Sequence, residues 1–306
     1  MFNPDKQLKN PAYLELDPQE RAARRDQFYR IMQSCEMCPH RCRVNRLQGE
    51  TGRCRVTGDL IITSAGPHFG EERELVGPAG SGTIFFVNCN LDCVYCQNWT
   101  ISTGVETDRI SSIEELARIM VSLQERGCCN INLVSPTPYL YHITAAIDKA
   151  AEMGLRLPVV YNCGGYESVE SLKLLEGFID IYMPDAKYGS NEKAREYSGA
   201  EDYYTRLKEA LKEMQRQVGD LKPGPGKIAY RGLLVRHLVL PEDLSGSEEV
   251  ARMLSEEVSP NCAVNVMAQY YPSHRANEFP PLRRRITSAE YSAAREAFRK
   301  AGLQLL

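Results

Sequence analysis

The chain has 306 residues, of which 43% are hydrophobic and 25% charged, and its formal net charge is -3. This composition is typical of a folded globular protein, and it excludes a disordered or fibrous chain as well as one drawn to nucleic acid by its overall charge. No apolar run reaches the roughly 20 residues that cross a bilayer, and the N-terminus is too polar for a signal peptide, so we expect a cytoplasmic protein without a membrane partner.

The first 75 residues differ in pattern from the rest of the chain. They hold a polar helical segment, four cysteines and several glycines, but little β pattern. We therefore predict a cysteine-rich N-terminal extension over residues 1–75, packed on a second unit that spans residues 76–306.

From residue 80 onward, short apolar runs alternate with segments of helical periodicity. The predicted strands are 83–88, 131–135, 158–162, 178–184, 233–241 and 263–271. The predicted helices are 112–126, 139–153, 167–176, 201–218, 247–257 and 288–301. Such an alternation predicts an α/β fold with a parallel sheet, either a partial or closed (β/α)6 barrel or a doubly wound sheet. The stretch 219–227 is rich in Gly and Pro and is expected to be an exposed loop.

Eleven cysteines are many for a protein in a reducing compartment, and seven of them fall into two groups. The first group has the spacing C-x2-C-x3-C-x11-C and consists of Cys35, Cys38, Cys42 and Cys54. We predict that this group binds a metal, and four unrelated thiols are the alternative. His40 could replace one of the cysteines as a ligand. Four thiolates suit either a structural zinc ion or an iron-sulfur cluster, and the spacing does not decide between them. A cluster would relay electrons or anchor a substrate, whereas zinc would fold the extension.

The second group follows the first predicted strand and consists of Cys89, Cys93 and Cys96, in the spacing C-x3-C-x2-C. This position is the C-terminal mouth of a parallel barrel, where such enzymes carry their active sites. Three thiolates can hold a [4Fe-4S] cluster and leave its fourth iron without a protein ligand. A closed structural zinc site normally takes four protein ligands, so the spacing favours the cluster.

The second group also resembles the signature of the radical S-adenosylmethionine (SAM) superfamily, in which an aromatic residue precedes the last cysteine, as Tyr95 does here. The segment CNLDCVYCQNW, and the sequence over residues 30–300, resemble the PflX-like relatives of pyruvate formate-lyase activating enzyme. The resemblance implies a barrel of radical SAM type and a cluster whose open iron binds SAM. It further implies reductive cleavage of SAM to a 5′-deoxyadenosyl radical, an electron donor such as flavodoxin or ferredoxin, and a possible protein substrate such as a glycyl-radical enzyme.

The resemblance also marks candidate SAM contacts at the mouth, beginning with Tyr95 in the cysteine motif. The turn Ser135-Pro136-Thr137-Pro138 stands where the activating enzymes carry Gly-Gly-Glu-Pro, which holds the methionine amine of SAM. The glutamate is missing here, and the hydroxyl groups of Ser135 and Thr137 are the candidates left. Asn162, before two glycines that let a ligand approach the backbone, is a further candidate.

Charged candidates come from the fourth and fifth predicted strands. Asp185 and Lys187 match a D-x-K motif that contacts the methionine and ribose of SAM in the activating enzymes, and residues two apart on a strand face the same way. An ion pair on the surface is the alternative for these two. Arg236 and His237 cannot both point into a barrel. We predict Arg236 as the contact of the SAM carboxylate, because a guanidinium can bind a carboxylate with two hydrogen bonds. For His237, a satisfied core residue is an equal alternative to a functional role.

The leading function is therefore a radical SAM enzyme that abstracts hydrogen from a substrate. A non-catalytic two-cluster iron-sulfur protein, for electron transfer or redox sensing, is the first alternative, and a zinc-stabilised binding protein is the second. The missing glutamate and the four N-terminal cysteines distinguish this chain from minimal glycyl-radical activating enzymes, so the hydrogen donor is left open.

Overall fold

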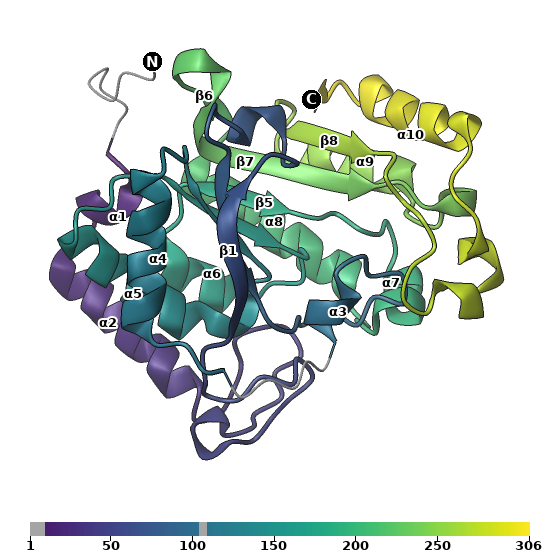
Figure 1. The fold of residues 1–306 in the computed structure, drawn as a ribbon. Coiled ribbons are helices and arrows are strands. Elements are labelled where there is room, and N and C mark those ends of the chain that lie inside the picture. Colours follow the sequence, from purple (N-terminus) through teal and green to yellow (C-terminus); the bar gives the residue numbers. More distant parts are fainter. Residues whose placement is uncertain (1–9, 104–108) are drawn as a thin grey trace.

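The computed structural model describes residues 10–103 and 109–306, and a nine-stranded sheet forms its centre (Figure 1). The strand order is β1-β2-β3-β4-β5-β7-β8-β9, and β6 pairs with β7 beside this path. Six neighbouring strands run parallel: β2 (Ser81–Phe86), β3 (Ile131–Val134), β4 (Val159–Cys163), β5 (Ile181–Pro184), β7 (Ala229–Leu238) and β8 (Ala263–Met267). These are the six strands that the sequence predicts, and the α/β class with a mostly parallel sheet is confirmed.

The six predicted helices also form, and they follow the parallel strands in chain order. They are α4 (Ile113–Glu125), α5 (Leu140–Glu152), α6 (Val169–Leu175), α8 (Tyr203–Val218), α9 (Ser247–Met253) and α10 (Ser288–Lys300). Side-chain caps begin several of them, since Ser112, Ser168 and Thr287 accept hydrogen bonds from the first turns of α4, α6 and α10. The N-terminal polar helix is α2 (Pro18–Ile31), which packs against α5 and α6.

The sheet is open, so a closed barrel is the wrong form of the prediction. Within the described residues, the end strands β1 (Ile62–His68) and β9 (Gln304–Leu305) pair only with β2 and β8. β1 is also unexpected, because it comes from the segment whose sequence shows little β pattern. Its residues are mostly exposed and show no clear alternation, and it forms because β2 offers an edge for antiparallel pairing. The division of the chain at residue 75 stays a prediction.

Shorter elements complete the connections. The short helices are α1 (Ala12–Glu15), α3 (Trp99–Ser102) and α7 (Asn191–Ser198), and the stretch 219–227 contains β6 (Lys222–Pro223). Single helical turns lie at Arg46–Gln48, Arg73–Leu75, Thr137–Tyr139, Pro225–Lys227, Pro241–Asp243, Ala276–Glu278 and Pro280–Arg283, and Leu254–Val258 continues α9 as a π-helical turn. None of the helices in the described part of the chain is long and apolar enough to cross a membrane.

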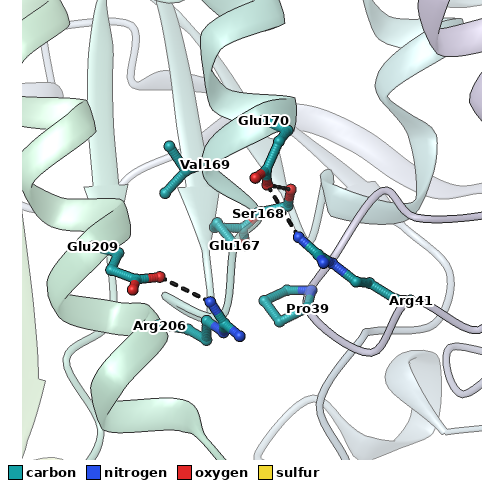
Figure 2. Close-up of a pocket in the computed structure, with 8 residues that line it drawn as sticks. All are labelled: Pro39, Arg41, Glu167, Ser168, Val169, Glu170, Arg206 and Glu209. Carbon is teal, nitrogen blue, oxygen red and sulfur yellow. Dashed lines mark hydrogen bonds and ion pairs between the residues drawn. The ribbon is translucent and has the colours of Figure 1, made fainter.

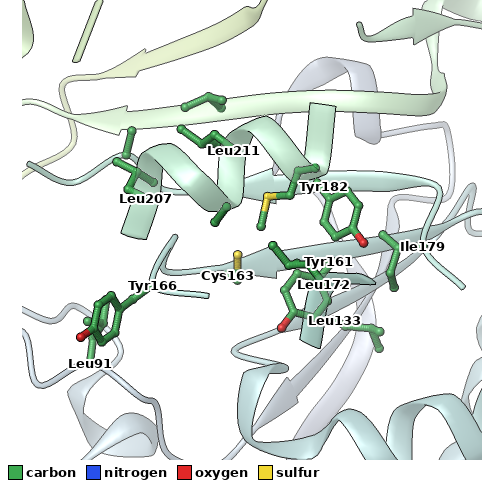
Figure 3. Close-up of a cluster of buried hydrophobic side chains, with 14 of the residues drawn as sticks. Leu91, Leu133, Tyr161, Cys163, Tyr166, Leu172, Ile179, Tyr182, Leu207 and Leu211 are labelled. Carbon is green, nitrogen blue, oxygen red and sulfur yellow. The ribbon is translucent and has the colours of Figure 1, made fainter. Parts of the chain in front are cut away.

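Apolar side chains pack on both faces of the sheet. The larger cluster fills the space between strands and helices, where Tyr161 and Tyr182 lie near Leu207 and Leu211 of α8 (Figure 3). A small cluster on the opposite, inner face consists of Leu75, Val160, Ile181, Met183, Ala229 and Leu234. Because side chains alternate along a strand, Asn162 faces the inner side while its neighbours Tyr161 and Cys163 face the helices. The inner face beyond this cluster, toward the carboxyl ends of the strands, carries the polar residues described next.

Candidate functional site

The cysteine triad, Cys89, Cys93 and Cys96, lies in the loop that follows β2 and precedes α3. The thiols face one another closely enough for the neighbouring sulfurs to add to the effect of burial, which raises the pKa of Cys89 to about 12 and that of Cys93 to about 11. Each sulfur also has a polar partner: the Leu91 amide donates to Cys89 (3.4 Å), the Ser198 hydroxyl donates to Cys93 (2.9 Å), and the Ser102 hydroxyl lies 3.1 Å from Cys96.

Helix α7 holds this loop in place. The amide of Asp92 donates to the carbonyl of Ser198 (3.1 Å), and the amide of Val94 donates to that of Tyr197 (2.9 Å). In the described residues, no three Cys, His, Asp or Glu side chains are arranged to hold a single metal ion. A four-iron cluster is a different ligand, because each thiolate binds a separate iron atom. The donor set of three thiols with hydrogen-bonded sulfurs fits such a cluster.

A buried ionic group lies beside the triad on the inner face of the sheet. Asp185 accepts hydrogen bonds from Lys187 Nζ (2.6 Å) and from Arg236 Nε (2.7 Å), and Arg236 Nη2 also donates to Asn162 Oδ1 (2.6 Å). Asp185 and Arg236 are neighbours across adjoining strand ends, which brings the pair together. The side chains of Asp185, Lys187 and Arg236 are only 15–17% exposed, so the alternative of a surface ion pair is not what forms.

The charges of this group set one another's ionisation. Burial alone would raise the pKa of Asp185, but Arg236 and Lys187 outweigh it and lower that pKa below its usual value. Lys187 also counteracts the burial that raises the pKa of Cys89 and Cys93. Its side chain approaches the triad loop at Gly164, where a Cβ would lie 2.7 Å from Leu91 Cδ1 and 3.8 Å from Lys187 Cε. The site thus offers positive and negative groups side by side within reach of the three thiols.

The other predicted contacts occupy different positions. Ser135 adopts a left-handed backbone (φ 57°) and donates its amide hydrogen to the Asn162 carbonyl (3.0 Å). Thr137 is buried on the helix-covered side, where its hydroxyl donates to Glu167 (2.8 Å). Tyr95 is 3% exposed and packs edge-on against Tyr188 and Tyr270. Their roles as SAM contacts stay predictions.

Of the two alternatives for His237, the satisfied core residue is the one that forms. Its Nδ1 lies 2.7 Å from the carbonyl oxygen of Ala186, its Nε2 lies 3.0 Å from the hydroxyl of Ser247, and the side chain has no exposed surface. Arg236, its neighbour, is therefore the residue of the two that faces the inner side.

Comparison with known proteins places this arrangement in a family. The description "Radical SAM superfamily" matches residues 83–220, which include the triad and Asp185. An uncharacterized protein of Methanocaldococcus jannaschii is 34% identical over 285 residues, which cover 90% of this chain and 77% of the relative. Residues 83–220 of this chain form a radical SAM superfamily domain. A radical SAM methyltransferase from Sphaerobacter thermophilus has the same fold, with a TM-score of 0.51 at 12% identity over 82% of this chain and 78% of that one. Membership implies a [4Fe-4S] cluster and SAM as cofactors.

Two buried glutamates near the predicted site residues, Glu71 and Glu167, were not predicted from the sequence. Glu71 lies in the connection between β1 and β2, and its Oε2 is 3.8 Å from Arg236 Nη1. Burial raises the pKa of this carboxyl group. Asn132 of β3 lies near Glu71, fully buried, yet neither polar atom of its amide makes a hydrogen bond of normal geometry. No local signal could have found Glu71, because Arg236 and Asn132, which it meets at the site, are distant from it in sequence.

Glu167 is the second glutamate, and it lies on the helix-covered side of β4. It accepts hydrogen bonds from the hydroxyls of Thr137 (2.8 Å) and Tyr161 (3.0 Å). Burial raises the pKa of Glu167 to about 7, although these bonds and one from Cys163 act to lower it. Because the unfolded carboxyl has a pKa of 4.5, the folded protein keeps a proton that the unfolded chain has already lost between these values.

Stability should therefore fall as the pH rises from about 4.5 to about 7, with Glu167 contributing about 3 kcal/mol of that loss. The change Glu167→Gln keeps the shape of the side chain without the ionisation, so the free energy of unfolding of the variant should lose this part of the pH dependence. Urea unfolding across the pH series measures it. Glu170→Gln, at an exposed position of α6, should leave most of the slope in place, and equal slopes in Glu167→Gln and the parent would contradict the assignment.

The N-terminal cysteine group, Cys35, Cys38, Cys42 and Cys54, gathers in one irregular loop region. Burial raises the pKa of Cys38, and the nearby thiols of Cys54 and Cys35 raise it further. Burial also raises the pKa of Cys54, where the thiols of Cys35 and Cys42 add to the effect. All eleven cysteines are free thiols in the structure. The four thiols of the group are thus near one another, and metal binding by them stays a prediction.

A pocket separates this loop region from helices α6 and α8. Figure 2 shows Arg41 of the loop paired with Glu170 at the start of α6 (3.6 Å), and Arg206 of α8 paired with Glu209 (3.0 Å). Glu167 lies at the floor of the lining, behind Ser168 (Figure 2). The pocket therefore marks where the N-terminal segment meets the helices of the main sheet.

Proposed function

We propose that this protein is an enzyme of the pyruvate formate-lyase activating enzyme type, which cleaves SAM reductively and abstracts a hydrogen atom from a substrate. The observation that carries the proposal is the position of the triad at the carboxyl end of β2, directly beside the ionic group of Asp185, Lys187 and Arg236. When bound, the cluster supplies the electron that splits SAM into methionine and a 5′-deoxyadenosyl radical.

The residues of the chain bind and orient the cofactor. SAM carries a carboxylate, an ammonium and a sulfonium, and the site presents charges of both signs. We assign Arg236 to the carboxylate, because Asp185 and Asn162 hold its Nε and Nη2, whereas its Nη1 has only the more distant Glu71 carboxylate (3.8 Å) as a partner. Lys187 and Asp185 fix each other next to the triad, and Asn162 adds an amide on the same face. Ser135, Thr137 and Tyr95 are proposed to shape the surrounding wall.

Two partners complete the proposal. A one-electron donor such as flavodoxin or ferredoxin reduces the cluster, and the hydrogen donor is a substrate that enters from the carboxyl ends of the strands, with a glycyl-radical enzyme as one candidate. The open sheet supports a substrate of this kind, because a polypeptide segment can approach an inner face that is not closed into a barrel.

The test is the formation of 5′-deoxyadenosine. The full chain, reconstituted anaerobically with iron and sulfide, reduced with dithionite and given SAM, should release the nucleoside and methionine, measured by chromatography. Cys93→Ala should abolish the product, because the cluster loses one of its three thiolates.

Cys128→Ala is the matched control, since Cys128 is a buried thiol in neither cysteine group, and this variant should keep the activity. A parent protein that holds iron and sulfide at the triad but forms no 5′-deoxyadenosine would overturn the proposal. That outcome would favour the non-catalytic electron-transfer alternative.

A further inference from the structure

We propose that the N-terminal cysteine group holds a second iron-sulfur cluster, which passes electrons to the cluster of the triad through His40 and Asn90. The inference rests on the proposed function for its acceptor, the triad cluster.

The first support is the environment of the N-terminal thiols. The peptide N–H of Arg53 donates to Cys42 Sγ (3.3 Å), and the backbone amides of His40 and Val56 act against the burial that raises the pKa of Cys38 and Cys54. Such bonds stabilise thiolates and tune the potentials of iron-sulfur clusters. They occur at the triad as well, where the Leu91 amide donates to Cys89.

Backbone geometry brings the thiol of Cys42 into the group. A Cβ at Gly52 would lie 2.7 Å from both Cβ and Sγ of Cys42, so only glycine permits this close approach. Arg41 and Arg43, on either side of Cys42, have left-handed backbones with φ of 42° and 57°. Strain of this kind persists only where the surrounding structure requires it, and it is common at functional sites. The loop is thus shaped around its sulfurs.

The second support is a direct connection between the two cysteine groups. The ring of His40 lies two residues after Cys38, and its Nε2 is 2.8 Å from the carbonyl oxygen of Asn90. Since a carbonyl only accepts, the ring donates this hydrogen bond. Asn90 adjoins Cys89 in the triad motif, so one hydrogen bond bridges the two cysteine-bearing segments.

The connection is held firmly from both sides. Asn90 is 2% exposed, and its side-chain amide donates to the carbonyl of Tyr166 (2.7 Å). The ring of Tyr166 packs edge-on against His40, with 5.0 Å between ring centroids. A partly buried, hydrogen-bonded contact that is held on both sides is what a fixed electron path requires, and a zinc ion that only folds the extension would not need it.

The transfer moves one electron from donor to N-terminal cluster to triad cluster. A low-potential one-electron donor reduces the N-terminal cluster, and the same electron then leaves it for the oxidised triad cluster. No bond forms or breaks in this step, and no proton moves.

The metal content of the full chain gives the first test. After anaerobic reconstitution with iron and sulfide, we expect about eight iron atoms per chain, twice the content of one four-iron cluster. The triple variant in which Cys89, Cys93 and Cys96 become Ala should keep about half of this iron, and Cys35→Ser in the parent should lose the other half. Zinc in the N-terminal group, or only one cluster in the parent, would overturn the proposal even if a variant failed to fold.

The electron path gives the second test, read by rapid-freeze electron paramagnetic resonance after mixing with one equivalent of dithionite. In the parent, the signal of the N-terminal cluster should decay while that of the triad cluster grows. His40→Phe keeps an aromatic ring against Tyr166 but removes the hydrogen bond to Asn90, so its N-terminal signal should persist longer. His40→Gln, whose amide can donate, should recover part of the rate.

The outcomes separate this inference from the proposed function. Equal transfer rates in His40→Phe and the parent, at equal iron content, would refute the path. A parent that cleaves SAM but holds zinc at the N-terminal group would refute the relay and leave the radical SAM function standing. A parent protein that holds two clusters and transfers electrons fast, but forms no 5′-deoxyadenosine, would refute the proposed function and leave the relay standing.

Discussion

Asp185→Asn should lower the free energy of unfolding by about 3 to 5 kcal/mol, the cost of removing one partner from a buried charge group. Asp185 accepts from Lys187 Nζ at 2.6 Å and from Arg236 Nε at 2.7 Å, and all three side chains are at most 17% exposed. An amide of the same shape leaves Lys187 without its carboxylate partner and Arg236 with only the more distant Glu71 (3.8 Å). Denaturant unfolding measures the loss, and we expect the formation of 5′-deoxyadenosine to fall with it.

Two further variants show whether charge is the cause. The double change Asp185→Asn with Lys187→Met removes one of the stranded cations, so it should be more stable than Asp185→Asn alone. Glu209→Gln breaks a surface pair with Arg206 whose side chains are 38% and 48% exposed, and it should cost at most about 1 kcal/mol. A loss in Asp185→Asn no larger than that of Glu209→Gln would show that the ionic group does not stabilise the fold.

Gly165→Ala is expected to have the second large effect, a loss of more than about 3 kcal/mol in the free energy of unfolding. Gly165 follows β4 with φ of 80°, and a Cβ there would lie 2.3 Å from the backbone oxygen of Asp185 and 2.8 Å from Leu207 Cδ1. Backbone cannot move aside as a flexible side chain can. The clash would displace Asp185 and, with it, the residues that it holds beside the triad.

Gly302→Ala is the matched control. Gly302 has φ of 77°, nearly that of Gly165, but no atom lies within 4 Å of its Cβ position. Only the backbone cost of a left-handed alanine applies, about 1 to 2 kcal/mol. Thermal or urea unfolding of the two variants compares them, and equal losses would mean that the contact with Asp185 is not the cause.

The sheet could be predicted because buried parallel strands are continuously hydrophobic. Runs such as 131–135 and 158–162 correspond to β3 and β4 within a residue. β1 could not be found in this way, because an edge strand with one buried residue carries no such pattern. Helix α7 was missed as well, since its sequence NEKAREYS is short and polar, and a cap at Ser190 and the left-handed Gly199 set its limits.

The site was predictable where the signal is local. The spacing of the triad placed three thiols in one loop, and the spacing of Asp185 and Lys187 placed both charges on one face. Glu71 and Glu167 carry no local signal, because Arg236 and Thr137 reach them only through the fold. Thr137 shows the same limit: its position in a turn was clear, but its direction toward Glu167 depends on packing between β4 and α6.

The two ends of the open sheet also bear on how the protein behaves at high concentration. Unpaired strand edges invite other chains to add to them, which leads to aggregation. At one end, β1 covers β2 and itself carries Pro67 and an irregular register between Ile62 and Ser64. At the other, β9 is two residues long. Each border is therefore a poor template for a further strand, which protects an otherwise aggregation-prone parallel sheet without closing it.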